Sequence, residues 1–191
     1  MASSVAAGLL VAALGPLAPN AAISVGRAAD GRGVEVRMES VVAAPLADVH
    51  AVVDDFASYP EWFPAMSQMQ ATPTQLDATF HLPWPLRTMR QRFAVAREHG
   101  HGEAVVRWRH LEGDFARNEG AWRLRALDGR RTLVRYDAVV QFRRWVPSWL
   151  IARAQRRGAQ QLLRSLEERA QARMSSGKLP SAQSERRSGI R

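Results

Sequence analysis

The chain has 191 residues, 46% of them hydrophobic, which suits one folded domain with extensions at its ends. It has no cysteine, so disulfides and thiolate chemistry are excluded. Its formal net charge of +9 at pH 7 favours anionic partners such as phospholipid headgroups or nucleic acid. Lys178 is the only lysine, so the alternative explanation of the charge is a protein that uses arginine as its ordinary surface cation.

The two ends of the chain differ in composition from the middle. Residues 1–30 are low in complexity and contain an apolar run, 5–17, that is too short to span a bilayer. We interpret this segment as a signal peptide, with a disordered extension as the alternative, and we favour export to the periplasm, with membrane association, over a cytoplasmic location. Residues 175–191 predict a disordered basic tail, which leaves 31–174 as the folded domain.

The first half of that domain begins with a strand and a helix. Residues 33–43 alternate between apolar and polar side chains, which predicts a half-buried strand. A proline and apolar residues at helical spacing then predict a helix over about 45–55. An aromatic segment follows at 59–64, and its two prolines disfavour a helical conformation at Tyr59 and Phe63.

Alternating segments then predict an antiparallel sheet. The expected strands are 66–72, 78–82, 88–98, 104–111, 119–127 and 132–142. Two prolines within 82–87 indicate an edge or a loop there. The last three strands each have one aromatic, apolar face and one arginine-rich face, a pattern typical of a sheet with one face in water.

A long helix is predicted over 147–174, roughly 40 Å in length. Its apolar stripe would cover the sheet, so we expect an α+β fold in which a curved antiparallel sheet of about seven strands wraps around this helix, with short helices after the first strand. Ala154 and Gly158 lie in the middle of the stripe. Such small residues fit either a cavity or close packing against Trp108 and Trp122.

Four motifs carry a resemblance to a known family. They are residues 55–62 (DFASYPEW), 82–87 (LPWPLR), the pair 120–124 (GAWRL) and 132–136 (TLVRY), and 145–150 (WVPSWL). In this order and spacing they resemble the START-like, or SRPBCC, helix-grip superfamily, in particular its coenzyme Q-binding and polyketide cyclase-like branch. One departure is that Thr88 follows Arg87, where related domains often have an acidic residue.

The resemblance implies a hydrophobic cavity between the sheet and the last helix, suited to lipids, quinones, sterols or polyketides. A pocket of this kind is apolar, with a few polar groups that orient the ligand. The polar candidates are Gln91, His110 and Tyr136, and the alternative for each is a buried side chain whose hydrogen bonds are satisfied within the protein. The complete expected lining is Trp62, Phe63, Trp84, Gln91, Phe93, Trp108, His110, Trp122, Tyr136, Ala138, Leu150 and Ala154.

A second cluster is expected where the last strand meets the helix. It consists of Arg143, Arg144, Trp145 and Trp149. Tryptophan together with arginine suits an anionic membrane surface, because the indole lies at headgroup level and the cation meets phosphate. The alternative is that the two tryptophans cap the core.

These observations predict a protein that binds a hydrophobic small molecule such as a lipid or quinone, with transport or chaperoning of that molecule as an extension of this role. The alternatives are a polyketide cyclase/dehydratase-like enzyme that acts on an aromatic or polyketide substrate, and an interaction protein without a ligand. No cofactor or metal is expected, because His99 and His101 flank a glycine without accompanying carboxylates and no nucleophile, P-loop or dinucleotide motif occurs. The aromatic side chains alternate onto the face opposite the arginines, which argues against nucleic acid as a partner.

Overall fold

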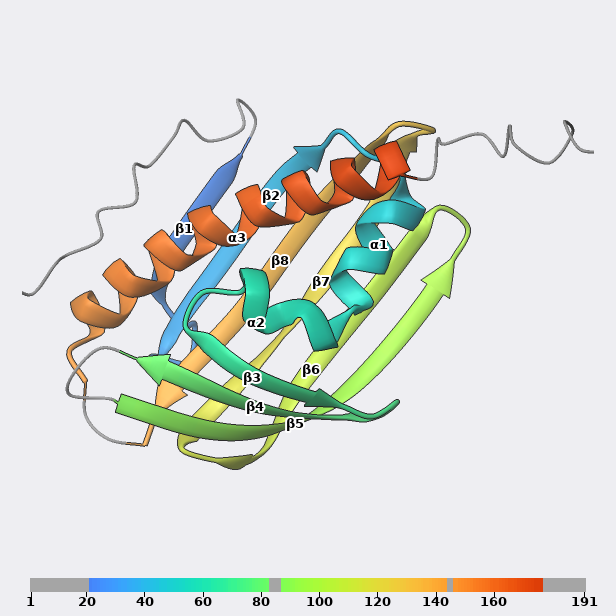
Figure 1. The fold of residues 1–191 in the computed structure, drawn as a ribbon. Helices are drawn as coiled ribbons and strands as arrows, with labels where there is room; N and C mark the ends of the chain where they lie inside the picture. Colours follow the sequence, from blue (N-terminus) through green and yellow to red (C-terminus); the bar gives the residue numbers. More distant parts are fainter. Residues whose placement is uncertain (1–20, 83–86, 144–145, 177–191) are drawn as a thin grey trace, which may run out of the picture.

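An antiparallel sheet of eight strands, with helices over one face, is seen in the computed structural model (Figure 1), which describes residues 21–82, 87–143 and 146–176. The sheet order is β1-β2-β8-β7-β6-β5-β4-β3. The strands are β1 (Ala22–Arg27), β2 (Val34–Val42), β3 (Met66–Ala71), β4 (Gln75–Leu82), β5 (Arg87–Gly100), β6 (Glu103–Gly113), β7 (Phe115–Asp128) and β8 (Arg131–Phe142). The helices are α1 (Leu46–Asp54), the short 3-10 turn η1 (Phe56–Ser58), α2 (Tyr59–Trp62) and α3 (Ser148–Ser176). The predicted α+β helix-grip architecture is confirmed.

The two faces of the sheet differ as the alternation predicts. On the helix-covered face, β7 and β8 pair so that Trp122 lies opposite Tyr136, and both side chains are buried. On the other face, arginines form exposed ion pairs, such as Arg123 with Asp137 at 2.5 Å. Exposed pairs of this kind add little to stability, so burial of the opposite face holds the sheet to its helices.

The helix α3 packs closely over only part of the sheet. It contacts α1, β1 and β2 and, less extensively, α2. Its own side chains Leu162, Leu166 and Ala170 are buried. Ala154, nearer its N-terminus, is exposed, because this half of the helix lies away from the central strands. Figure 1 shows α3 along the β1–β2 side of the sheet and α1 at the C-terminal end of α3. No helix within the described ranges is long and apolar enough to cross a bilayer.

The predicted conformation of the aromatic segment was wrong at Tyr59. This residue is helical (φ −53°, ψ −39°), because Pro60 lies in the first turn of α2, where a helix does not need a backbone N–H. Phe63, before the second proline, is extended (φ −86°, ψ 119°), as predicted. The segment is therefore one helical turn followed by an extended corner.

The boundaries of the folded domain also differ from the prediction. Strand β1 lies within the segment 1–30, which was expected to be a signal peptide or an extension, and pairs with β2 from Ala22↔Glu39 to Arg27↔Val34. Its Ile23 and Val25 pack against the core, but the strand is too short to show clear alternation in sequence. This strand brings the sheet to eight rather than about seven. Residues 1–20 and 177–191 lie outside the described ranges.

A cavity between the sheet and helix α3 as the candidate functional site

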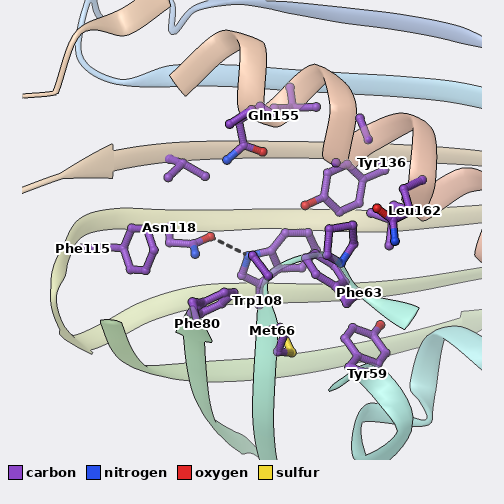
Figure 2. Close-up of a pocket in the computed structure, with 18 of the residues that line it drawn as sticks. Tyr59, Phe63, Met66, Phe80, Trp108, Phe115, Asn118, Tyr136, Gln155 and Leu162 are labelled. Atoms are coloured by element: carbon purple, nitrogen blue, oxygen red, sulfur yellow. Dashed lines mark hydrogen bonds between the residues drawn. The ribbon is translucent and has the colours of Figure 1, made fainter. Parts of the chain in front are cut away.

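A cavity of about 400 Å³ lies between the middle strands of the sheet, the corner after α2 and the N-terminal half of α3 (Figure 2). Its volume is within the range of small-molecule sites. Most of its surface is apolar. The sheet contributes Phe93, Val106, Trp108, Trp122 and Val140, the strand ends contribute Phe80, Phe115 and Phe142, and α3 contributes Ala154, Gly158 and Leu162.

The floor of the cavity is built around Trp108 on β6. Its indole lies against Gly120 of β7, where a Cβ atom would come within 2.6 Å of the ring and 2.1 Å of the Asp137 carbonyl oxygen. Only glycine leaves room for the ring at this point. The indole N–H donates a hydrogen bond to Oδ1 of Asn118 at 3.3 Å, and the ring centroid is 5.4 Å from that of Tyr136. Because residue 120 is a glycine, the Trp108 ring can lie where it contacts both Asn118 and Tyr136.

The aromatic corner forms one edge of the cavity. Tyr59 stacks on Phe63 with a centroid distance of 5.6 Å, and its hydroxyl donates to the Val53 carbonyl at 2.6 Å. Burial raises the pKa of Tyr59 well above its ordinary value, so its hydroxyl remains a donor. Pro64 follows, and its Cβ lies 3.9 Å from where a Cβ on Gly158 of α3 would be. The corner and α3 therefore approach each other at Pro64 and Gly158.

Few polar groups face the cavity. Asn118 on β7 and Tyr136 on β8 lie on the sheet side, whereas Gln155 lies on the α3 side (Figure 2). Gln161 is a second glutamine that α3 contributes to the lining. Burial raises the pKa of Tyr136, and the nearby Asp137 carboxylate adds to that shift. Its phenol therefore stays neutral in the physiological range. Among the described lining residues, the only positively charged side chain is that of Arg157, on an exposed part of α3.

The structure brings half of the predicted binding residues to the cavity. These are Phe63, Phe93, Trp108, Trp122, Tyr136 and Ala154. Trp84 lies outside the described residues. Whether any of them binds a ligand stays a prediction, but their common location explains why the inward-facing aromatic pattern was a useful signal.

The other predicted residues lie elsewhere. Trp62 is buried beside the cavity and its indole donates to Oγ of Ser58 at 3.2 Å. Gln91 and His110 are hydrogen-bonded to each other rather than to a ligand site, as the alternative of satisfied side chains proposed. The remaining two are Ala138, which is buried with too short a side chain to reach the lining, and Leu150, which is half-buried on α3.

Asn118 and Phe115 were missed because the predicted strand started at residue 119. Strand β7 starts at Phe115, so the inward alternation that includes Trp122 continues backwards through Gly120 to Asn118. Extending the period of two by four residues would have found Asn118. The glycine interrupted the apolar pattern and hid the continuation.

The structure describes two of the four predicted membrane-docking residues, Arg143 and Trp149. Arg143 is held at the end of β8, where its Nε donates to the carbonyls of Gly113 and Phe115 at 3.0 and 3.2 Å. Trp149 is 68% exposed, so it does not cap the core. Arg144 and Trp145 lie outside the described residues.

A basic surface surrounds Trp149 on α3. It consists of Trp149, Arg153, Arg156 and Arg157, and we call it the α3 basic surface. The three arginines are exposed, and the described residues provide no ion-pair partner for them. Since Arg157 also lines the cavity, this surface lies beside the cavity.

The histidines that the structure describes are scattered and form no cluster of metal ligands. In the described ranges, no three His, Cys, Asp or Glu side chains are grouped so that they could hold a metal ion. His50 and His99 are in edge-to-face contact with a centroid distance of 4.7 Å, and Nε2 of His50 is buried without a hydrogen-bond partner among the described residues. Burial, followed by the neighbouring His99, lowers the pKa of His50.

Comparison with known proteins identifies the family. The sequence model for polyketide cyclase/dehydrase and lipid transport matches residues 42–167, which is most of the chain, so the protein belongs to this family. No match was found among curated proteins.

Solved structures share the fold. A lipid transfer protein from Xanthomonas axonopodis, described as STAR-related, is 21% identical with a TM-score of 0.68, covering 82% of this chain and 97% of that chain. A START superfamily protein from Mycobacterium smegmatis is 22% identical with a TM-score of 0.61, covering 72% and 97%. The Zhui aromatase/cyclase from Streptomyces sp. R1128 is 18% identical with a TM-score of 0.61, covering 75% and 97%. At these identities the likeness shows the helix-grip fold of the START superfamily and nothing finer.

Proposed function

We propose that this protein binds a hydrophobic small molecule, such as a lipid or a quinone, in the cavity beneath α3. The observation that carries the proposal is a cavity of about 400 Å³ whose lining is mostly aliphatic and aromatic. Apart from the indoles, its polar side chains are Tyr59, Asn118, Tyr136, Gln155, Arg157 and Gln161. Each 100 Å² of apolar ligand surface removed from water there contributes about 2.5 kcal/mol before the costs of association.

The supporting detail is the contrast between the cavity and the rest of the molecule. Most lining side chains are aliphatic or aromatic, whereas the opposite face of the sheet carries ion-paired arginines such as Arg92 and Arg135. An apolar ligand would therefore find an extended apolar contact surface under α3. The match to a family described as polyketide cyclase/dehydrase and lipid transport supports a hydrophobic ligand.

Binding is better supported than catalysis. A cyclase-like reaction needs a general acid or base near the substrate. His110, the candidate for that role, does not line the cavity and is hydrogen-bonded to Gln91. The hydroxyl of Tyr59 donates a hydrogen bond to the Val53 carbonyl, and burial raises the pKa of Tyr136 above its ordinary value.

The test is native mass spectrometry of the full chain, followed by organic extraction and lipid analysis of the material that it carries. We expect either a stoichiometric apolar molecule or, for a protein that loses its ligand on purification, saturable binding of the neutral fluorophore N-phenyl-1-naphthylamine. A protein that carries no apolar molecule and binds no fluorophore, while its circular dichroism shows a folded state, would contradict the proposal and favour the interaction protein.

We further propose that the α3 basic surface docks on an anionic membrane, from which the cavity could be loaded. The specific observation is Trp149, 68% exposed on the helix that also lines the cavity, together with exposed Arg153 and Arg156. Each arginine near an anionic surface contributes about 1 kcal/mol. Two of them therefore correspond to a change in affinity of roughly thirtyfold.

Vesicle co-sedimentation separates this surface from the general charge of the protein. Vesicles of phosphatidylcholine with phosphatidylglycerol should bind the protein, and vesicles of phosphatidylcholine alone should not. The double variant Arg153→Gln/Arg156→Gln should lose most of the binding. The matched control Arg109→Gln/Arg125→Gln removes the same charge from exposed positions on β6 and β7. Equal losses in the two double variants would refute docking through α3.

A further inference from the structure

The amide of Asn118 presents hydrogen-bond donors to the cavity. Asn118 is only 9% exposed, and its side chain lines the cavity. The indole N–H of Trp108 can only donate, so the atom that receives it must be the amide oxygen, at 3.3 Å. This contact fixes the orientation of the amide and leaves its two N–H donors, for which the described residues provide no acceptor.

The hydroxyl of Tyr136 is the second polar group of this wall. The described residues form no hydrogen bond with it, although Tyr136 is only 9% exposed. Trp108 contacts both residues, through its N–H on one side and its ring on the other, so the two polar groups belong to one wall (Figure 2). Neither the amide nitrogen of Asn118 nor the hydroxyl oxygen of Tyr136 is among the fully buried atoms that lack a partner, so both are accessible from the cavity, where a ligand can accept their hydrogen bonds.

The charge of the surroundings limits what that partner can be. No carboxylate lines the cavity in the described part of the chain, and its one arginine, Arg157, is on an exposed part of α3. A buried anionic group on the ligand would need a cation beside it, and the Asn118–Tyr136 wall offers none. Neutral N–H and O–H donors match a neutral acceptor, of which a carbonyl oxygen is the simplest.

We propose that Asn118 and Tyr136 form a subsite that binds the carbonyl oxygen of a neutral, otherwise apolar ligand, such as a ketone, a quinone or an ester. This inference rests on the proposed function, since it assigns a ligand class to the same cavity. Trp108 is a positioning residue: it holds the amide of Asn118 so that the donors face the ligand.

A matched pair of probes tests the subsite. Fluorenone and fluorene have nearly the same shape, but only fluorenone has a carbonyl group. We expect the wild-type protein to bind fluorenone more tightly than fluorene. The ratio of the two affinities should fall about three- to tenfold in Asn118→Leu and in Tyr136→Phe, which corresponds to the loss of one hydrogen bond. Tyr136→Phe removes a hydroxyl without a partner among the described residues, so it should fold even if Asn118→Leu does not.

The infrared carbonyl band of bound fluorenone provides an independent reading. Hydrogen bonding should shift the band to lower wavenumber in the wild-type protein than in an alkane, and each variant should move it back. A band at the alkane position, or an affinity ratio equal in the wild type and in Tyr136→Phe, would overturn the subsite while leaving the proposed function intact. If the folded protein binds neither probe, the proposed function fails, and the subsite fails with it.

Discussion

Gly158 gives the sharpest test of the cavity edge between α3 and the corner, because one substitution should change stability and ligand affinity in opposite directions. It lies in the interior of the 29-residue helix α3 and has an ordinary negative φ, so replacing it by alanine should stabilise the helix by about 1 kcal/mol. The added Cβ meets only Pro64, at 3.9 Å, which is a normal van der Waals contact. For a domain of this size the melting temperature should rise by about 2–4 °C.

Gly158→Leu should also stabilise the helix, but it should lower the affinity for the ligand. Its longer side chain would lie between α3 and Pro64, where these two elements approach each other at the edge of the cavity. We therefore expect the affinity for N-phenyl-1-naphthylamine to fall by about tenfold, equivalent to about 1.4 kcal/mol. Ala172→Leu places the same side chain on an exposed part of α3, away from the cavity, and serves as the control.

Urea denaturation and fluorescence titration measure the two effects separately. A destabilised Gly158→Ala variant would show that the backbone at this position is not an unstrained helix. Unchanged probe binding by Gly158→Leu, with stability raised as expected, would show that the ligand does not pass between α3 and the corner. Either result would refute the arrangement of the cavity edge described above.

Three further predictions concern the supports of the cavity and the stability of the fold. Gly120→Ala should destabilise the protein by about 1–3 kcal/mol and change its near-ultraviolet circular dichroism, because the new Cβ would collide with the Trp108 ring; an unchanged spectrum would contradict this. Tyr59→Phe should cost about 1–3 kcal/mol in urea denaturation, because it leaves the buried Val53 carbonyl without its donor. Burial lowers the pKa of His50 below 6.5, so the unfolded chain takes up this proton more readily and stability should fall as the pH drops below about 6.5. His50→Gln should lose less stability than the wild type between pH 7.5 and pH 5, and equal losses would contradict the assignment.

Most of the architecture followed from local patterns. Alternation with a period of two identified the inward faces of β6, β7 and β8, and with them Trp108, Trp122 and Tyr136. A period of 3.6 residues and an opening proline predicted α3 almost to its ends. These patterns work because the side chain of a strand or helix residue points in a direction set by its own backbone.

The location of the cavity depended on contacts between distant segments. The same stripe on α3 includes buried Leu162 and exposed Ala154, because the helix packs on α1, β1 and β2 at one end and lies away from the central strands at the other. His110 shares a face with Trp108, yet its hydrogen bond to Gln91 keeps it out of the lining. Periodicity states which face of an element is apolar, but only the packing of the helices on the sheet decides which part of that face is covered and which part is left to a ligand.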